Sequence, residues 1–493
     1  MQHRLLPLIV LTAALTASTG VAGDAVDIFA GIELGDCRIS AGPGFPGIKA
    51  RCGSLWRHED PTDPGSTMLE LKVAVVPALS LEPAPDPFVP IAGGPGQGSI
   101  EFYAAFAPAF EKVRRNRDIL LLDQRGTGNS ATLDCDTGDE IIEGQISIEQ
   151  TVADTRDCLA DLPHDPRFFT TSVAVLDLEA LRQALGYGKL NLYGVSYGTR
   201  VAQHFLRRHP DSTRSVIIDG VVPPQLALGP GIALEAQKAL EAIFSRCAES
   251  AACDQRFPDL REQFAALELE LAAGAVTVEL PHPISGARET LEFGAAEFAG
   301  ALRLLSYHPN SVALLPLLIE HAANGNYTLL AAQYLSVAER MADSISLGMH
   351  NAVVCTEDAP FFDGEEITEE QLEATYIGAF QLEALRAICG VWPGGVLDDD
   401  FKTPVSSGKP VLLLSGEADP VTPPQFAELA MIDFENARHI IGRRQGHGQA
   451  PRGCMPDIIG RFVESAALDG LQEDCFERVF AMPFFLDFSG PAP

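Results

Sequence analysis

Short apolar runs alternate with segments of helical spacing over the first half of the chain. The runs predict strands within PFVPIAGGPGQG (87–98), DILLLDQRGTGNS (118–130), KLNLYGV (189–195) and RSVIIDGVVPP (214–224). The helical spacing predicts helices in SIEFYAAFAPAFEKVRRN (99–116), SVAVLDLEALRQALG (172–186) and YGTRVAQHFLRRH (197–209). Such alternation predicts an α/β fold, in which helices cover both faces of a mostly parallel sheet.

Two local features refine this pattern. Residues 47–79 predict a β-hairpin, because two strand-like runs flank the turn-rich segment EDPTDPGS. Ser99 is the first residue of the first helical segment and is predicted to be its N-cap.

The alternation stops near Pro224 and resumes only at KPVLLLSGEADPVTPP (409–424), which ARHIIGRRQGHG (437–448) follows. Residues 225–400 are mostly helical in pattern and rich in alanine and leucine. A helical insertion within one α/β domain explains this order better than three domains in series. The predicted units are a first part of the core, a cap and a C-terminal part of the core, at residues 24–224, 225–400 and 401–493.

The N-terminal segment MQHRLLPLIVLTAALTASTGVAG has one arginine, an apolar stretch and small residues at its end. This order is typical of a secretory signal peptide covering residues 1–23, with cleavage after Gly23 or, alternatively, Ala22. No later apolar run in the sequence is long enough to cross a membrane. A secreted or periplasmic protein without stable membrane insertion is expected.

Charge and cysteine content fit that setting. Removing residues 1–23 takes away Arg4 and no acid, so 34 basic and 67 acidic residues leave a net charge of −33. Such a chain would repel nucleic acid and anionic membranes. An even count of ten cysteines behind a signal peptide predicts disulfides, for which neighbours in sequence are the favoured pairs among several possible pairings. No metal site is expected, because neither CxxC nor HExxH occurs.

One serine stands at a predicted strand–helix corner. The segment GVSYG places Ser196 between Gly194 and Gly198, after the run LNLY and before a helical pattern. A serine hydroxyl is a weak nucleophile at neutral pH, so it needs an exposed position and an adjacent base. A sharp turn with small flanking residues provides the exposure, and G-x-S-x-G in this setting is the nucleophile elbow. Ser196 is therefore predicted to be a nucleophile.

The order acid, then histidine, after the serine selects its partners. His447 lies in the glycine loop QGHGQ and is preferred as the base, whereas His439, in ARHII, is predicted to be a strand residue. Asp419, beyond the strand VLLLSG and before Pro420, is preferred to Glu417 as the acid that orients the imidazole.

An oxyanion hole needs two backbone donors. The N–H of Tyr197, just after the nucleophile, is predicted to be one of them. The second is expected from the loop AGGPGQG, with Gly94 as the first choice and Gly93 as the alternative, because glycine lets the backbone approach a substrate closely.

The motifs GGPG, DQRGTGNS, GVSYGT, GEADPVTP and GHG occur in this order. The sequence resembles the α/β-hydrolase fold and, more narrowly, the serine peptidases of the proline iminopeptidase and tripeptidyl aminopeptidase-like family. The resemblance covers about residues 47–480. Many iminopeptidases have histidine before the two glycines, whereas Ala92 stands here, which favours the tripeptidyl side.

The resemblance implies a secreted aminopeptidase that binds the free N-terminus of a peptide through carboxylates of the cap and needs no cofactor. Glu357, in VVCTEDAP, is the candidate for this contact, and Asp358 is the alternative. Asp123 and Arg125, in DQRGTG, are expected to brace the oxyanion loop as a charged pair. A carboxylic ester hydrolase with the same Ser-His-Asp set is the alternative function, and a non-catalytic binding protein is a third reading.

Overall fold

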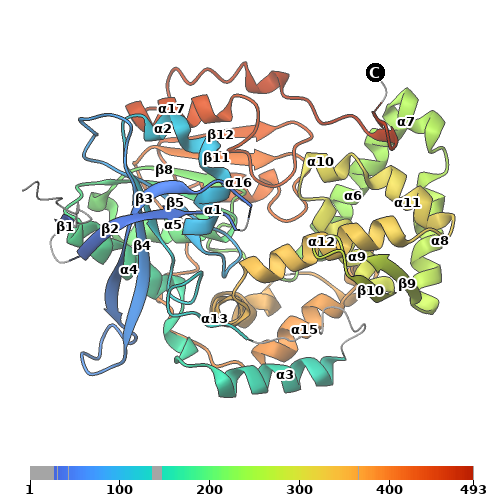
Figure 1. Cartoon of the computed structure of the whole chain (residues 1–493), viewed down its shortest axis with the longest axis horizontal. Helices are drawn as coiled ribbons and strands as arrows, with labels where there is room; N and C mark the ends of the chain where they lie inside the picture. The colour runs from blue at the N-terminus through green and yellow to red at the C-terminus, as the bar shows by residue number, and fades with distance from the viewer. Residues whose placement is uncertain (1–26, 30–31, 43, 136–146, 365, 492–493) are drawn as a thin grey trace, which may run out of the picture.

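A ten-stranded sheet forms the centre of the molecule (Figure 1). The computed structural model describes residues 27–29, 32–42, 44–135, 147–364 and 366–491, so the predicted signal peptide lies outside the described residues. In spatial order the strands are β1 (Asp27–Phe29), β2 (Ile32–Ile39), β3 (Ile48–His58), β4 (Met68–Val76), β6 (Ile119–Leu122), β5 (Phe88–Ile91), β7 (Leu190–Val195), β8 (Thr213–Asp219), β11 (Val411–Gly416) and β12 (Ala437–Gly442).

The sheet is antiparallel at one side and parallel at the other. Strands β1 to β4 pair antiparallel and join β6, and they include the predicted hairpin of β3 and β4. From β6 through β5, β7, β8 and β11 to β12 all pairs are parallel. The carboxyl ends of these parallel strands therefore lie at one edge, which is where ligands bind in open α/β sheets.

Helices cover both faces of the parallel strands, so apolar side chains of each strand point to both faces of the sheet. Along β5, Val89 packs on one face with helices α4 (Thr171–Ala184), α5 (Tyr197–Arg208) and α16 (Pro424–Met431). Its neighbour Phe88 packs on the other face with α1 (Ser99–Phe106), α2 (Glu111–Arg114) and α17 (Met455–Ser465). This two-sided burial explains why the strands read as continuous apolar runs.

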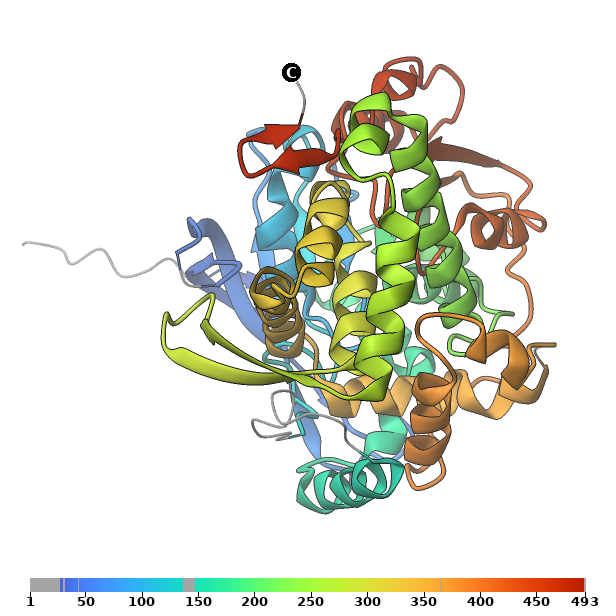
Figure 2. The ribbon, with the colours of Figure 1, turned by 90° about the vertical axis from the view of Figure 1, so that its right-hand side faces the viewer.

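A second apolar cluster is formed by residues of the cap, whose helices lie in front of the sheet in Figure 2. It comprises α6 (Ile232–Glu249), α7 (Ala251–Arg256), α8 (Leu260–Ala273), α9 (Ala295–Leu305), α10 (Pro309–Val312), α11 (Leu315–Ala323) and α12 (Thr328–Ser344), together with a hairpin of β9 (Val276–Pro281) and β10 (Arg288–Phe293). The hairpin was not anticipated from the helical composition. Its alternating burial leaves every second residue of β9 in solvent, as in a strand with one covered face.

A layer of shorter helices lies below the sheet in Figure 1 and follows α12 in sequence. It contains α13 (Leu347–Glu357), α14 (Glu369–Glu373) and α15 (Phe380–Cys389), with α3 (Ile148–Asp161) packed on α15. A capping box is present at α14, where Thr368 and Gln371 exchange hydrogen bonds. None of the helices in the described part of the chain is both long and apolar enough to span a bilayer.

The C-terminal residues cross from the core to the cap. Strands β13 (Phe485–Asp487) and β14 (Gly490–Pro491) form a small hairpin beside α7 and α11, and the amide of Phe485 donates to the carbonyl of Ala313 at 2.9 Å. Phe484, near the end of this segment, is buried in the cap cluster.

All five favoured disulfides form, and each joins neighbours in sequence. The pairs are Cys37–Cys52, Cys135–Cys158, Cys247–Cys253, Cys355–Cys389 and Cys454–Cys475. Because each bridge closes a loop of 34 residues or fewer, it stabilises a local unit and leaves core and cap joined by packing and hydrogen bonds.

Two sequence interpretations need correction. Ser99 does not cap α1, since Gly98 occupies the cap position and the Ser99 hydroxyl accepts from the amide of Ala92. Arg125 does not pair with Asp123. It binds Asp177 of α4 in a bidentate contact at 2.7 and 3.0 Å, because a fully buried guanidinium needs a buried counter-charge.

Candidate active site

Ser196 occupies a sharp corner between β7 and α5. Its backbone has φ 54° and ψ −126°, a conformation that lifts the side chain out of both elements. The two flanking glycines are required by space: a Cβ on Gly194 would lie 2.2 Å from the carbonyl oxygen of Gly198. A Cβ on Gly198 would lie 2.4 Å from the carbonyl oxygen of Ile91 in β5. Any larger residue at either position would push the helix away from the sheet.

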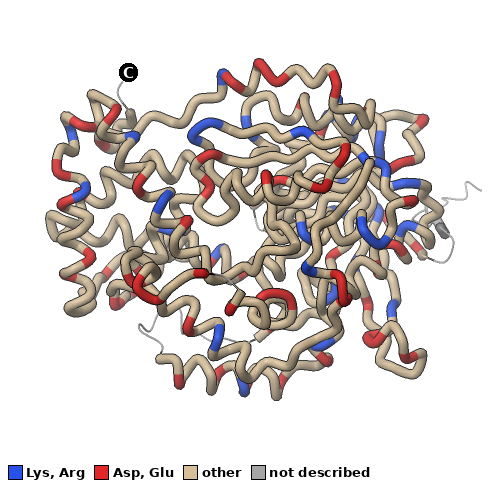
Figure 3. The backbone as a smooth tube through the Cα atoms, turned by 180° about the vertical axis from the view of Figure 1, so that it is seen from behind, with Lys and Arg blue, Asp and Glu red and all other residues tan. Residues whose placement is uncertain are grey.

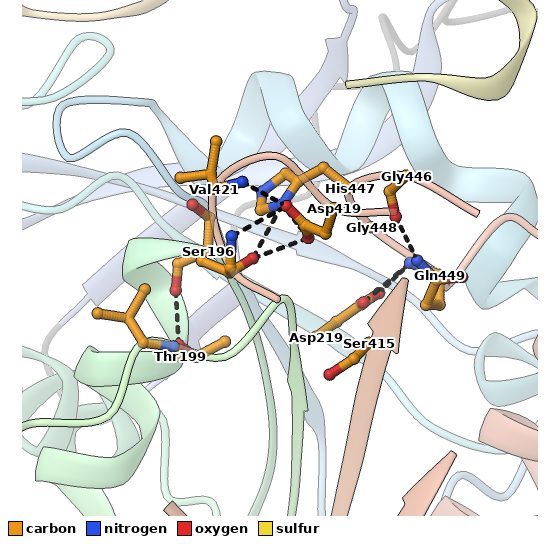
Figure 4. Close-up of polar contacts among 12 residues, drawn as sticks. Ser196, Thr199, Asp219, Ser415, Asp419, Val421, Gly446, His447, Gly448 and Gln449 are labelled. Carbon is orange, nitrogen blue, oxygen red and sulfur yellow. Dashed lines mark hydrogen bonds and ion pairs between the residues drawn. The ribbon is translucent and has the colours of Figure 1, made fainter. Parts of the chain in front are cut away.

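Asp419 and His447 meet at the carboxyl end of the sheet (Figure 4). The Nδ1 of His447 lies 2.7 Å from Oδ2 of Asp419. The same carboxylate accepts hydrogen bonds from the amides of Val421 and Thr422 at 2.9 Å and from the Thr422 hydroxyl at 2.8 Å. These contacts fix the carboxylate, so it can hold the imidazole in one tautomer with Nε2 free to act.

The electrostatics of this pair favour a charged carboxylate beside an easily protonated ring. Burial opposes ionisation of Asp419, but His447 and the hydrogen-bond donors hold its pKa below the ordinary value. Burial likewise opposes protonation of His447, but the Asp419 carboxylate raises the pKa of the imidazole above its ordinary value of 6.5. The ring is therefore suited to accept a proton from a nearby hydroxyl and return it.

Ser196 and His447 line one cavity of about 530 Å³ between the sheet and the cap. The segment Asp219–Gly220, at the end of β8, lies against both residues. The carbonyl of Asp219 accepts from the amide of Ser196 at 2.9 Å, and a Cβ on Gly220 would lie 2.8 Å from Cε1 of His447. The structure thus brings the predicted nucleophile, base and acid, which are spread over more than 220 residues of sequence, to one edge of the sheet.

The loop that carries His447 is anchored on both sides. On the core side, the buried Asp219 carboxylate accepts from the amides of Gln449 and Ala450 at 2.8 Å. On the cap side, the amide of His447 donates to the carbonyl of Tyr307 at 2.8 Å, and the Tyr307 ring stands edge-on to the imidazole. These contacts position the base from two independent elements.

The expected oxyanion loop lies against the nucleophile. Gly93 is so close that a Cβ there would meet Cβ of Ser196 at 3.0 Å and its Oγ at 3.6 Å. Gly94 lines the cavity with φ +105°, and Tyr197 follows Ser196 as the first residue of α5. Backbone donors at the start of a helix and in a glycine loop are well suited to stabilise a developing oxyanion.

Sequence comparison agrees with this arrangement. Residues 86–251 match the family model described as alpha/beta hydrolase fold, and residues 374–475 match the model described as TAP-like protein.

The chain has the α/β-hydrolase fold.

Three relatives show what this hydrolase is similar to. Serine protease Hip1 of Mycobacterium tuberculosis is 24% identical over 402 residues, which cover 71% of this chain and 74% of Hip1. The tripeptidyl aminopeptidase of Streptomyces coelicolor is 24% identical over 433 residues, covering 79% and 76% of the two chains. YuaR, a hydrolase of Escherichia coli, is 31% identical over 170 residues, and that match spans only a third of its length.

The two acids expected to bind a substrate ammonium do not line the cavity of the hydrolase. Glu357 is fully buried and accepts from the amide and hydroxyl of Thr171 at 2.7 and 3.0 Å, with Arg200 at 3.6 Å. Asp358 pairs with Arg200 at 2.9 Å and with Lys402 at 3.4 Å. Both carboxylates therefore already have cationic partners in this structure.

Sequence reasoning missed Asp219 and Thr422. Asp219 is the last residue of β8, the strand next to the elbow, and precedes a glycine. An acid at the carboxyl end of a central parallel strand is a signal that it serves the site edge. The rejected alternatives have other partners: Glu417 accepts from the amide of Arg444, and His439 contacts Ser415.

The pH profile of the hydrolase should report the raised pKa of His447. A general base works only when neutral, so kcat/KM should fall with decreasing pH through a midpoint above 6.5, the ordinary value for histidine. Glu357 also titrates in this range, since burial raises its pKa to about 7 despite Arg200. The Glu357→Gln variant should therefore keep the acid limb where it is, and a limb at or below 6.5 in the parent protein would contradict the assignment.

Proposed function

We propose that this hydrolase is a secreted or periplasmic serine peptidase that releases short peptides or single residues from the N-terminus of peptide substrates. The observation that carries the proposal is the 2.7 Å contact of His447 with Asp419 beside a cavity that Ser196 also lines. Two relatives over most of the chain, a tripeptidyl aminopeptidase and a serine protease, support peptides as substrates.

The reaction would proceed through an acyl-enzyme. Ser196 Oγ attacks the scissile carbonyl while Nε2 of His447 takes its proton. The amides of Tyr197 and Gly94 hold the oxyanion of the tetrahedral intermediate. His447 then protonates the departing amine, and water, activated by the same imidazole, releases the acyl group. Asp419 stabilises the imidazolium at each proton transfer.

The cap limits what can react. Cavities that hold small ligands measure about 300–1,000 Å³, and the 530 Å³ cavity here lies in that range. This space accommodates a few residues of extended peptide and excludes a folded domain. An exopeptidase that acts on short or unfolded peptides fits these dimensions better than an endopeptidase of folded proteins.

The test is mass spectrometry of products from a mixed peptide library, offered with free and with acetylated N-termini. We expect fragments of about one to three residues from the free peptides alone, and none in a Ser196→Ala control. Internal cleavage, or equal cleavage of both sets, would contradict the N-terminal specificity. Hydrolysis of simple acyl esters without any peptide cleavage would instead assign the ester hydrolase.

A further inference from the structure

The cavity at Ser196 carries positive charge without negative charge. Arg303, Arg340 and Arg452 contribute to its lining, whereas none of the described residues that line it is aspartate or glutamate. The whole chain has a formal net charge of −32, and acidic positions occur on both core and cap (Figure 3). The cavity lining therefore carries arginine charge, whereas the chain as a whole is strongly acidic.

Arg303 lies on α9, and its side chain has no ion-pair or hydrogen-bond partner among the residues that the structure describes. Its Nε is buried and unsatisfied. Leaving a guanidinium group partly buried without an acceptor costs free energy, unless a ligand supplies that acceptor. The side chain is therefore suited to a negatively charged group that enters from the cavity.

Arg340 and Arg452 bind only neutral acceptors. Arg340, on α12, donates from Nε to the carbonyl of Ser336 at 2.8 Å and contacts the hydroxyl of the same residue. Arg452 contacts Nδ1 of His308 at 3.3 Å. Burial, together with the nearby Arg452, lowers the pKa of His308 to about 4, so that ring is neutral and adds no negative charge beside Arg452.

Acids close to the cavity have other partners, and Asp419 contacts His447 at 2.7 Å. Glu357 and Asp358 bind Arg200 and Lys402 behind the cavity wall. Asp219, whose charge acts on Arg452, accepts from two backbone amides in the histidine loop. Helices α9 and α12 pack against each other, so Arg303 and Arg340 belong to one wall of the cap.

We propose that these arginines select substrates that carry a carboxylate. Guanidinium groups bind carboxylates through paired, charge-assisted hydrogen bonds, and their strength rises where water is excluded. The carboxylate belongs either to an acidic side chain of the peptide or to the free C-terminus of a short peptide. The proposal rests on the proposed function, since it concerns the cavity in which Ser196 would act.

The experiment compares matched substrates on the full-length protein. One arm uses peptide anilides that differ only by glutamate or glutamine at each position, and the other uses short peptides with a free or amidated C-terminus. We expect kcat/KM to be about tenfold or more higher for the acidic member of at least one arm. In the Arg303→Gln/Arg340→Gln variant that preference should fall to about twofold or less, while the neutral substrate is hydrolysed as before.

Two controls show whether a negative result contradicts the carboxylate proposal or has another cause. Arg288→Gln removes the same charge from an exposed cap position outside the cavity lining and should keep the preference. With the unmodified protein, glutarate should inhibit hydrolysis of a neutral substrate more strongly than its diamide does, a measurement that needs no variant to fold. Equal inhibition, or a preference that survives loss of both arginines, would overturn the carboxylate proposal. Absence of hydrolysis of every substrate would instead overturn the proposed function.

Discussion

Replacing Ser196 with alanine is expected to lower kcat by about 10⁶-fold while the fold remains intact. Ser196 bonds to Asp219 through its backbone amide and not through Oγ. Alanine keeps this bond, so the corner does not depend on the hydroxyl. Only the proposed nucleophile is lost, and the proposed oxyanion donors and the cavity remain. The variant should also fail to react with a fluorophosphonate probe, as read by intact-protein mass.

The matched control is Ser285→Ala, which removes a hydroxyl from an exposed turn of the cap hairpin. It should be labelled and active like the parent protein. A Ser196→Ala protein that retains labelling or turnover would place the nucleophile elsewhere. Equal thermal unfolding of the two variants would exclude misfolding as the cause of the loss.

Replacing Asp419 with asparagine is expected to lower kcat by about 10⁴-fold. The amide would occupy the same volume and could still bond to Val421 and Thr422. It would no longer stabilise a positive charge on His447, and its NH₂ group would favour the wrong tautomer of the imidazole. Because the carboxylate raises the pKa of His447, the acid limb of any residual activity should also move to lower pH.

Glu417→Gln provides the comparison, since Glu417 lies two residues away and is exposed. Its carboxylate accepts from the amide of Arg444 at 2.8 Å and so acts on the loop, not on the imidazole. We expect kcat to change by less than about tenfold and the pH profile to stay in place. A larger loss in Glu417→Gln than in Asp419→Asn would reverse the choice of acid. Both proteins should be compared by steady-state kinetics on the same substrate.

Much of the fold could be predicted because its central strands are buried on both faces. Continuous apolar runs such as ILLL at Ile119–Leu122 predict buried strands. The alternation of helices and strands predicts the α/β fold class. The β9–β10 hairpin escaped prediction because it lies in a segment whose composition is helical. The docking of Phe484 on the cap depends on a contact between segments far apart in sequence, which local patterns do not report.

The residues of the candidate site likewise include some that local sequence patterns predict and others that they do not. Ser196 could be found because its local geometry demands two glycines in sequence, and Asp419 and His447 because they follow strands in the expected order. The partner of Arg125 could not be found, since the nearest acid in sequence, Asp123, instead accepts from the amide of Ile100. The arginines of the cavity wall were missed because helical spacing does not tell which face of α9 and α12 points to the nucleophile.

The hydrogen bonds between cap and catalytic loops bear on protein engineering. The carbonyl of Tyr307 holds the amide of His447, and the carbonyl of Gly96 accepts from the amide of Ser346 at 3.1 Å. The loops on either side of the nucleophile are thus each tied to the insertion that roofs them. A chimaera that exchanges this insertion for that of another enzyme must reproduce both backbone contacts, or it loses alignment of the imidazole along with the old specificity.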